Sequence, residues 1–195
     1  MQDFVHLHVH TQYSILDGQA SIPRLVDKAM ANGMRGIAVT DHGDMFGIKE
    51  FFNYVNKKNG GTNGEIKDLK KKIAALESGK EESENPEAEI AACKEQLEAA
   101  KKKLFKPIFG CEMYVARRRL EDKEGKPDQS GYHLVVLAKN LKGYHNLIKL
   151  VSKDQGILYA SSYRPCGVGE VSRGTDCMLG LFGRGSAPTY HGRTV

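Results

Sequence analysis

Short apolar runs alternate with amphipathic stretches in the first part of the chain, and this alternation restricts the possible fold more than any other feature. The apolar runs at residues 4–9 and 35–40 predict strands. The three- and four-residue spacing of apolar side chains over residues 22–31 and 45–57 predicts helices. Strands that alternate with helices favour a parallel sheet covered by helices, so we expect an α/β fold.

The length of the chain limits how far this pattern can extend. With 195 residues there is room for one domain of ordinary size. A complete (β/α)₈ barrel takes about 250 residues, so a barrel would be incomplete here. The apolar runs are much shorter than the roughly 20 residues of a membrane-spanning helix, and residues 1–10 lack the pattern of a secretory signal. We therefore expect a cytoplasmic protein without contact to membranes.

Charge and cysteine content are unremarkable for a protein of this kind. The formal net charge of +5 is compatible with a nucleic-acid environment but also with an ordinary protein surface. The four cysteines have unrelated spacings, which form neither a disulfide framework nor a zinc-binding pair. We expect all four to be reduced thiols: Cys93, Cys111, Cys166 and Cys177.

A segment of different composition, residues 60–106, interrupts the α/β pattern. It opens with GGTNG, and residues 65–103 then consist almost entirely of Ala, Glu, Lys, Leu, Ile and Gln, with one break at residues 78–86. Each half carries one apolar stripe at helical spacing, which predicts an inserted helical hairpin. Because its charges alternate in sign, a solvated antiparallel pair is favoured over a nucleic-acid-binding patch.

The α/β pattern returns after the hairpin and then stops. The runs PIFGCEMYVA and YHLVVLAKN predict two further strands, and residues 141–153 predict a helix. Beyond Lys153 no lysine occurs, glycine is frequent, and neither the helical nor the strand period continues. We expect residues 154–195 to form a poorly ordered tail outside the folded domain.

Three histidines alternate on the first predicted strand. His6, His8 and His10 would all project from one face of that strand. The neighbouring apolar residues are typical of a buried parallel strand, where chance histidines on a solvent face are not expected. Metal ligation explains this pattern better than packing does.

Further ligand-type residues lie where α/β folds place their active sites, just past the carboxyl ends of strands. Imidazoles and carboxylates without a thiolate suit a hydrolytic cluster of zinc, manganese or iron, with magnesium as a further option. Paired metals of this kind activate water and stabilise an in-line displacement at phosphorus. The residues concerned are Asp17, Asp41, His42, Glu112 and His133.

Four runs of sequence together resemble one known family. HLHVHTQYSILDG, AVTDHGDMFG, KPIFGCEMYVA and YHLVVLAKNLKGYHNLIKLVS are similar to the successive motifs of the PHP (polymerase and histidinol phosphatase) domain. HxH and TDHG occur across the superfamily, whereas YSILDG, FGCEMYVA and LAKNLKGYHNLIKLVS resemble the form at the amino terminus of bacterial DNA polymerase III alpha subunits. The resemblance covers residues 3–153 and implies an incomplete PHP-type barrel, a distorted relative of the TIM barrel, with the hairpin as an insertion.

The resemblance also implies roles for individual residues. His8 and His10 match the first metal motif, His42 matches the second, and Glu112 matches a carboxylate that bridges two metals. Asp17 and His133 match further ligands. We expect His8, His10 and Glu112 to be catalytic as well as metal-binding.

Two neighbouring residues are weaker ligand candidates. His6 stands where many relatives have aspartate, and Asp41 is expected to orient a ligand from behind. A later Asp-x-His pattern of the family has no counterpart in this sequence.

The tail after Lys153 has a specific relation to the family. Relatives continue with text similar to GFYxRPR, ELEKYH and CSACLGGE. Residues 155–163 can be encoded so that the frame one base later reads KGFYMRPR, and the same frame can give AELEK and LIACSACLGGEVP further on. Three such segments in one frame favour a frameshifted tail over a natural short variant.

The resemblance implies a parent protein that is a DNA-directed DNA polymerase. Its PHP domain would be a metal-dependent 3′–5′ exonuclease-type phosphoesterase or a scaffold for the proofreading exonuclease subunit, with DNA and other replicative holoenzyme subunits as partners. We expect the 195-residue chain itself to be inactive. A stand-alone PHP phosphoesterase acting on a small phosphate monoester is the alternative, and a pure binding module is a third hypothesis.

Overall fold

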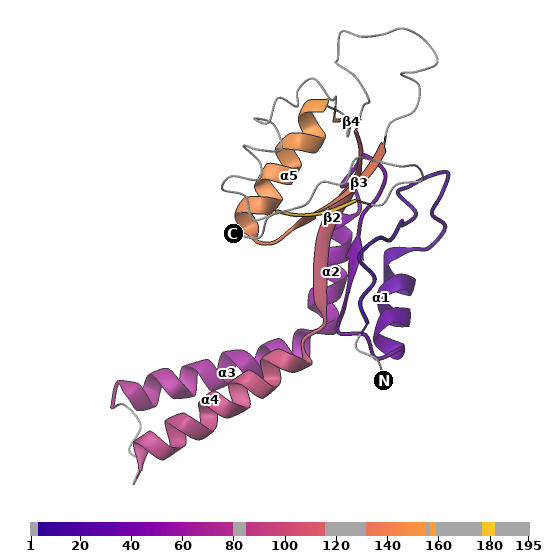
Figure 1. Ribbon diagram of the computed structural model, residues 1–195. Helices are drawn as coiled ribbons and strands as arrows, with labels where there is room; N and C mark the ends of the chain where they lie inside the picture. Colours follow the sequence, from indigo (N-terminus) through magenta and orange to yellow (C-terminus); the bar gives the residue numbers. More distant parts are fainter. Residues whose placement is uncertain (1–3, 80–84, 116–131, 155–156, 159–176, 182–195) are drawn as a thin grey trace, which may run out of the picture. The chain divides into compact units, whose positions relative to one another are not determined.

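The computed structural model of the chain describes residues 4–79, 85–115, 132–154, 157–158 and 177–181. Its elements follow in the order α1 (Ile22–Ala31), β1 (Gly36–Val39), α2 (Ile48–Lys58), α3 (Gly60–Glu77), α4 (Pro86–Lys103), β2 (Lys106–Val115), β3 (Tyr132–Ala138), α5 (Leu141–Asp154), β4 (Ile157–Leu158) and β5 (Cys177–Leu181) (Figure 1). The chain divides into two compact units. The first comprises Met1–Val5, Ile22–Ile37 and Lys49–Pro107, and the second comprises His6–Ser21, Ala38–Ile48 and Ile108–Val195.

Helix α1 has the bounds that its apolar spacing predicts. Ile22, Val26 and Ala29 are buried, so one face of the helix enters the core of the first unit. The helix ends at Ala31, and Gly33 has a φ of 73°, the left-handed conformation that commonly follows a helix end. The predicted helix is confirmed.

Helix α2 begins three residues after the predicted start at Met45. A turn occupies the intervening positions: the carboxylate Oδ1 of Asp44 accepts a hydrogen bond of 3.1 Å from the backbone N–H of Phe46. The N–H of Ile48 donates to the carbonyl of Met45 at 3.2 Å. The side chain of Asp44 thus competes with helix formation, which shortens the helix at this end.

Helices α3 and α4 form the predicted hairpin (Figure 1). Their buried side chains are Ile73 and Leu76 on α3, and Cys93 and Ala100 on α4, in keeping with one apolar stripe on each helix. The side chain of Asn85 caps α4 by accepting a hydrogen bond from its first turn, and proline occupies the first helical position.

The GGTNG segment that opens the insertion forms the first turn of α3. Only Asn59 separates α2 from α3, and its N–H donates to the carbonyl of Val55 at 2.9 Å. The carbonyl of Asn59 in turn accepts from Asn63 at 2.8 Å. Helical hydrogen bonding therefore continues across the junction and overrides the low helix propensity of the glycines.

The described strands form a five-stranded sheet in the order β1-β2-β3-β5, with β4 paired to β2. A bridge between His42 and Glu112 is parallel, whereas β2 and β3 are antiparallel. The expectation of parallel strands therefore holds for β1 with β2 and for β4 with β2, but not for β2 with β3. The described residues form a mixed α/β arrangement, and no closed barrel is present among them.

The predicted first strand, residues 4–9, is not a regular strand. The carbonyls of His6 and Val9, three residues apart, accept hydrogen bonds of 2.9 Å from Ala38 and Thr40, which are two residues apart. The N–H of Val9 donates instead to the side-chain oxygen of Thr40 at 2.8 Å. The segment of residues 6–9 thus has one more residue than the part of β1 that it faces, as in a β-bulge. This extra residue interrupts the hydrogen-bond ladder, and the chain bends at residues 7 and 8.

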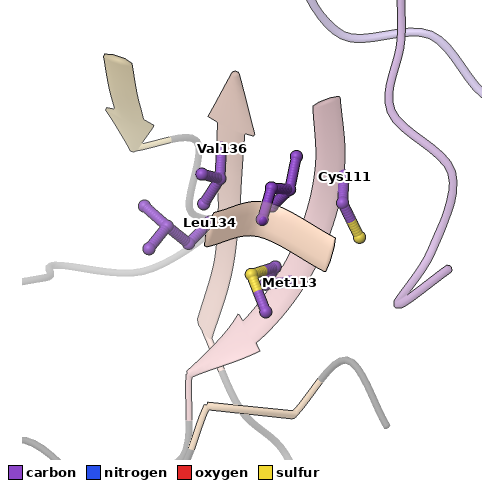
Figure 2. Packing of buried hydrophobic residues seen from close by; sticks show 5 residues of the cluster. Cys111, Met113, Leu134 and Val136 are labelled. Carbon is purple, nitrogen blue, oxygen red and sulfur yellow. The ribbon is translucent and has the colours of Figure 1, made fainter. Parts of the chain in front are cut away.

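Both faces of the central strands of the second unit are buried. On one face Cys111 and Met113 of β2 pack with Leu134 and Val136 of β3 and with Leu147 of α5 (Figure 2). On the other face Val135 and Leu137 cluster with Ala38. Alternate residues of β3 thus enter different clusters, as the two-residue period of a strand requires.

Two short strands lie in the region after Lys153, where we expected a poorly ordered tail. β4 pairs with β2 in parallel, and β5 pairs with β3 in antiparallel orientation. The rest of that predicted tail, apart from Asp154, lies outside the described residues. Among the described helices, none is both long enough and apolar enough to cross a membrane.

Candidate metal centre

Glu112 is a buried acidic residue in the middle of β2, with a relative exposure of 1%. Its neighbours Cys111 and Met113 enter the cluster against α5, so the two-residue period turns Glu112 to the opposite face of the sheet. His133 of β3 faces the same side, because Leu134 next to it belongs to the α5 cluster. The alternation of side chains along β2 and β3 thus places the carboxylate of Glu112 and the imidazole of His133 on the same face of the sheet.

The orientation of β3 explains how His133 reaches this site from the beginning of a strand. Because β3 runs antiparallel to β2, its first residues lie beside the end of β2, and His133 pairs with Tyr114. The Nδ1 atom of His133 lies 2.5 Å from the Oε1 atom of Glu112. The expectation that ligands follow the carboxyl ends of strands does not hold for this residue.

The bent segment before β1 supplies two more imidazoles. The Nε2 atoms of His8 and His10 lie 3.1 Å and 2.9 Å from the Oε2 atom of Glu112. These two Nε2 atoms are 3.0 Å from each other. His6 is exposed and belongs to neither of the two metal-ligand groups found among the described residues, because the bend at residues 7 and 8 breaks the alternation that would align it with His8.

His42, just after β1, links Glu112 to the loop that follows the bent segment. Its Nδ1 atom lies 3.0 Å from Oε2 of Glu112, and its Nε2 atom lies 2.8 Å from Oδ2 of Asp17. Asp17 has a side-chain exposure of 60%, whereas that of Glu112 is 2%. The site therefore extends from a buried carboxylate outward to an exposed one.

These ligand atoms form two groups that share Glu112. One consists of His8, His10 and Glu112, and the other of His42, Glu112 and His133, with the atoms of each group within 4.8 Å of one another. Three imidazole nitrogens crowd one carboxylate oxygen, which is more than its hydrogen-bonding capacity explains. Separations of about 3 Å are typical of neighbouring ligands on one cation. The donor set therefore fits divalent metal ions.

Asp41 lies behind these residues and contacts the backbone and hydroxyls of the preceding loop. It is buried, with 1% exposure. Its Oδ1 atom accepts hydrogen bonds from the N–H of Thr11 at 2.6 Å and the hydroxyl of Ser14 at 2.8 Å, and its Oδ2 atom accepts from the hydroxyl of Thr11 at 2.8 Å. Asp41 is thus fully engaged in holding residues 11–14 beside the ligands.

Comparison with known protein families matches residues 6–171 to the PHP domain. The chain belongs to the PHP domain family. The matched range of the PHP domain contains every candidate ligand from His8 to His133 and continues past Lys153.

Three similar curated proteins are each named DNA polymerase III subunit alpha. The chain is 36% identical over 159 residues to the protein of Treponema pallidum, 31% over 183 residues to that of Borreliella burgdorferi, and 30% over 166 residues to that of Aquifex aeolicus. These alignments cover 80%, 92% and 81% of this chain. They cover only 10%, 12% and 10% of the relatives, so the chain spans about a tenth of their length.

Electrostatics within the PHP domain favour nitrogen and oxygen ligands. Burial raises the pKa of the Glu112 carboxyl, but the hydrogen bond from His8 and the charges of His42 and His133 outweigh it, so the pKa lies below its ordinary value. Burial, and then the charge of His42, lowers the pKa of His10. Glu112 is therefore held as a carboxylate and His10 as a neutral imidazole, which are the forms that bind metals.

The pKa of the neighbouring Cys111 thiol is shifted upward, in contrast to that of Glu112. Burial, followed by the charges of Asp44 and Asp41, raises the pKa of Cys111 to about 12. Its Sγ atom donates to the carbonyl of Asp41 at 3.5 Å. Cys111 stays a protonated thiol and is unsuited to be a ligand.

Sequence reasoning did not single out Thr11 and Ser14, although both are buried and lie beside the ligands. Both occur in the run HTQYS directly after the histidine motif. Hydroxyls in such a run are common in ordinary turns, so only the contacts with Asp41 distinguish them.

Proposed function

We propose that this chain is the amino-terminal PHP part of a DNA polymerase III alpha subunit, and that its site hydrolyses phosphoester bonds at the 3′ end of DNA with divalent metal ions. The convergence of four imidazoles on the carboxylate of Glu112 is the observation that carries this proposal. The similarity to proteins named DNA polymerase III subunit alpha supports a polymerase as the parent protein. On the same basis we propose DNA and the other holoenzyme subunits, including the proofreading exonuclease, as partners, and a cytoplasmic location.

The residues of the site have distinct tasks in this mechanism. His8 and His10 would hold one cation, and His42 and His133 a second, with Glu112 shared between them. When bound, such ions lower the pKa of a water molecule and polarise the phosphoryl oxygen. Zinc, manganese or iron suit the mixed imidazole and carboxylate set better than magnesium, which prefers oxygen ligands.

The protein itself contributes positioning and charge. Glu112 is buried, so its negative charge acts on the site with little screening by water. Asp17 contacts the outer nitrogen of His42 and restrains that ring. Since small misplacements of reacting groups can cost on the order of 10²-fold in rate, these restraints matter for catalysis.

Hydrolysis assays test the proposal. The 195-residue chain and a chain extended in the alternative frame are incubated with Mn²⁺ or Zn²⁺ on single-stranded DNA and on a small phosphate monoester. We expect weak metal binding and little activity from the 195-residue chain, and DNA hydrolysis by the longer one, because two-metal sites need all their ligands in place. A variant with both His8→Ala and His10→Ala is the blank for each chain.

The outcomes separate the proposal from its rivals. Hydrolysis of the monoester without hydrolysis of DNA would favour a stand-alone phosphoesterase. Metal binding without hydrolysis in the longer chain would favour a structural site that serves as a scaffold. Robust DNA hydrolysis by the 195-residue chain that disappears in the double variant would show that the described ligands suffice.

A further inference from the structure

Ser14 joins two metal-ligand segments and the buried Asp41 through a single hydroxyl. Its Oγ atom donates to Oδ1 of Asp41 at 2.8 Å and accepts from the backbone N–H of His42 at 3.1 Å. The Nδ1 atom of His10 lies 3.1 Å from the same oxygen. Ser14 is 3% exposed, so water has little access to replace any of these bonds.

The number of protons and lone pairs on the Ser14 hydroxyl determines which partner donates in its hydrogen bond with His10. A serine hydroxyl has one proton and two acceptor lone pairs. The proton lies toward Asp41, and one lone pair accepts from His42, whose backbone N–H can only donate. The contact with His10 is therefore satisfied when Nδ1 of that ring carries a proton and donates to Ser14.

We propose that Ser14, oriented by Asp41, is a positioning residue that holds His10 in the Nδ1–H form, so that its Nε2 atom presents a lone pair to the metal. This inference rests on the proposed function, because it takes His10 to be a metal ligand. It adds a specific task for a hydroxyl in the loop between the two histidine motifs.

The alternative form of the His10 ring shows why such a restraint is needed. Nε2 of His10 lies 2.9 Å from Oε2 of Glu112. Without a restraint, a proton on Nε2 could form a hydrogen bond to that carboxylate and occupy the place of the cation. Any fraction of the protein in this form lowers the apparent metal affinity in proportion. The bond to Ser14 opposes this change and also ties His42 to the same oxygen.

The first measurement uses the unaltered chain loaded with Zn²⁺ and labelled with ¹⁵N in its histidines. Long-range ¹H–¹⁵N correlation identifies which ring nitrogen carries the proton. We expect a slowly exchanging Nδ1 proton on His10 and zinc on Nε2. Coordination through Nδ1, or a proton on Nε2, overturns the inference whether or not any variant folds.

The second measurement compares Zn²⁺ affinity by calorimetry in two matched variants. Ser14→Ala removes the bond to His10, and we expect a loss of about 10- to 100-fold, as is typical when the partner of a ligating histidine is removed. Thr11→Val is the comparison variant, because it removes the other hydroxyl that donates to Asp41, and the acceptor of the Tyr13 N–H, but leaves the bond between Ser14 and His10 in place. We expect a smaller loss of zinc affinity in Thr11→Val than in Ser14→Ala, and no loss in the control Ser78→Ala at the exposed end of α3.

The outcomes distinguish this inference from the proposed function. Equal zinc affinity in Ser14→Ala and the unaltered chain overturns the role of Ser14 but leaves the metal site intact. An equal loss in Thr11→Val and Ser14→Ala also overturns it, because a general loosening around Asp41 would then explain both. Failure of the unaltered chain to bind zinc contradicts the metal site on which both proposals rest.

Discussion

Glu112 is central to the site because its one side chain contacts imidazoles from three other segments of the chain. It lies at a position of β2 whose neighbours are buried against α5, and its carboxylate therefore faces the other side of the sheet. His8, His10 and His42 contact one of its oxygens, and His133 contacts the other. A change at this residue should affect both ligand groups at once.

We predict that Glu112→Gln abolishes metal binding in both groups. Glutamine keeps the shape and hydrogen-bonding reach of the side chain but removes the charge, so the affinity should fall by at least on the order of 100-fold while the fold is retained. Metal content after dialysis, together with circular dichroism, measures this. Glu95→Gln on the exposed face of α4 is the control, and unchanged metal content in Glu112→Gln would contradict the shared role.

Gly18 closes the loop that carries Ser14 and Asp17, and we predict that Gly18→Ala destabilises the chain by about 1–3 kcal/mol. A Cβ atom there would lie 2.0 Å from the carbonyl oxygen of Thr11, a backbone atom that cannot turn aside. Gly64→Ala on α3 is the matched control, because nothing lies within 4 Å of its Cβ position. There we expect a gain of about 0.5–1 kcal/mol, as for alanine in a helix interior.

Denaturant unfolding measures both glycine variants. Metal affinity should fall in Gly18→Ala along with stability, since the loop holds one ligand and the positioning hydroxyl. Equal stability of the two variants would show that the loop tolerates a side chain at Gly18.

The metal-free chain should lose stability as the pH falls below the ordinary pKa of histidine. The folded pKa of His10 is lowered by burial and by the charge of His42, from a model-peptide value of 6.5. Below that pH the unfolded chain binds a proton more readily than the folded chain, so acid favours unfolding, and above it both forms are neutral. Melting temperatures in chelator at pH 7.5 and 5.5 test this. His10→Gln should reduce the difference, whereas a change at the exposed His145 should not.

At the residue scale, the side chains that gather at the site could be predicted but the supporting contacts could not. The histidines and carboxylates stand out in sequence because few other roles explain an alternating run of imidazoles. Ser14 does not, since its role depends on Asp41, 27 residues away in sequence. His6 was predicted to share a face with His8, and the bend between them could not be inferred from the alternating pattern.

At the scale of elements, a reciprocal contact at the base of the α3–α4 hairpin joins its two ends to each other. The side chain of Asn59 donates to the carbonyl of Phe105 at 2.8 Å and accepts from its N–H at 3.1 Å. Asn59 precedes α3, and Phe105 follows α4. The two ends of the insertion are therefore held together by residues outside the helices themselves.

We predict that residues 65–103 can be replaced by a short Gly/Ser linker without loss of metal binding. All the candidate ligands lie in the second unit, whereas the hairpin belongs to the first, and the contact between Asn59 and Phe105 would remain. Metal content of the purified protein should match that of the full chain. Loss of metal from a deletion variant that remains folded would show that the hairpin helps to build the site.

The elements that the sequence predicts best are those with clear ends and a single apolar face. α1 and α5 agree with their predicted ranges to within a residue, because their apolar residues recur at a clear helical spacing. The start of α2 could not be predicted, since it depends on the side chain of Asp44. Residues 4–9 have the composition of a strand, but the bond from Val9 to the side chain of Thr40 interrupts the ladder.

At the scale of the whole molecule, the candidate site is built from segments far apart in sequence. Its candidate ligands come from the bent segment near the amino terminus, the residues just after β1, the middle of β2 and the beginning of β3. An α/β class was predictable from the order of elements. The antiparallel pairing of β2 and β3 was not, because the order of helices and strands does not define the direction of every strand.

The region after Lys153 is where sequence pattern and family resemblance diverge most, and we predict that the gene changes reading frame near codon 154. The family match continues to residue 171, and β4 and β5 lie within residues 154–195. Yet the same stretch can be encoded so that the next frame reads KGFYMRPR, AELEK and LIACSACLGGEVP in order. If the frame has shifted, the nucleotide sequence should use the required codons throughout.

Sequencing the gene through and beyond this region checks the prediction directly. The alternative frame should run on into a long open reading frame that encodes polymerase carboxylates. Codons at residues 155–163 that cannot yield KGFYMRPR in the next frame, or an unrelated gene downstream in every frame, would contradict it. In that case residues 154–195 are the chain's own sequence, and the pairing of β5 with β3 would be a native means of covering that strand edge.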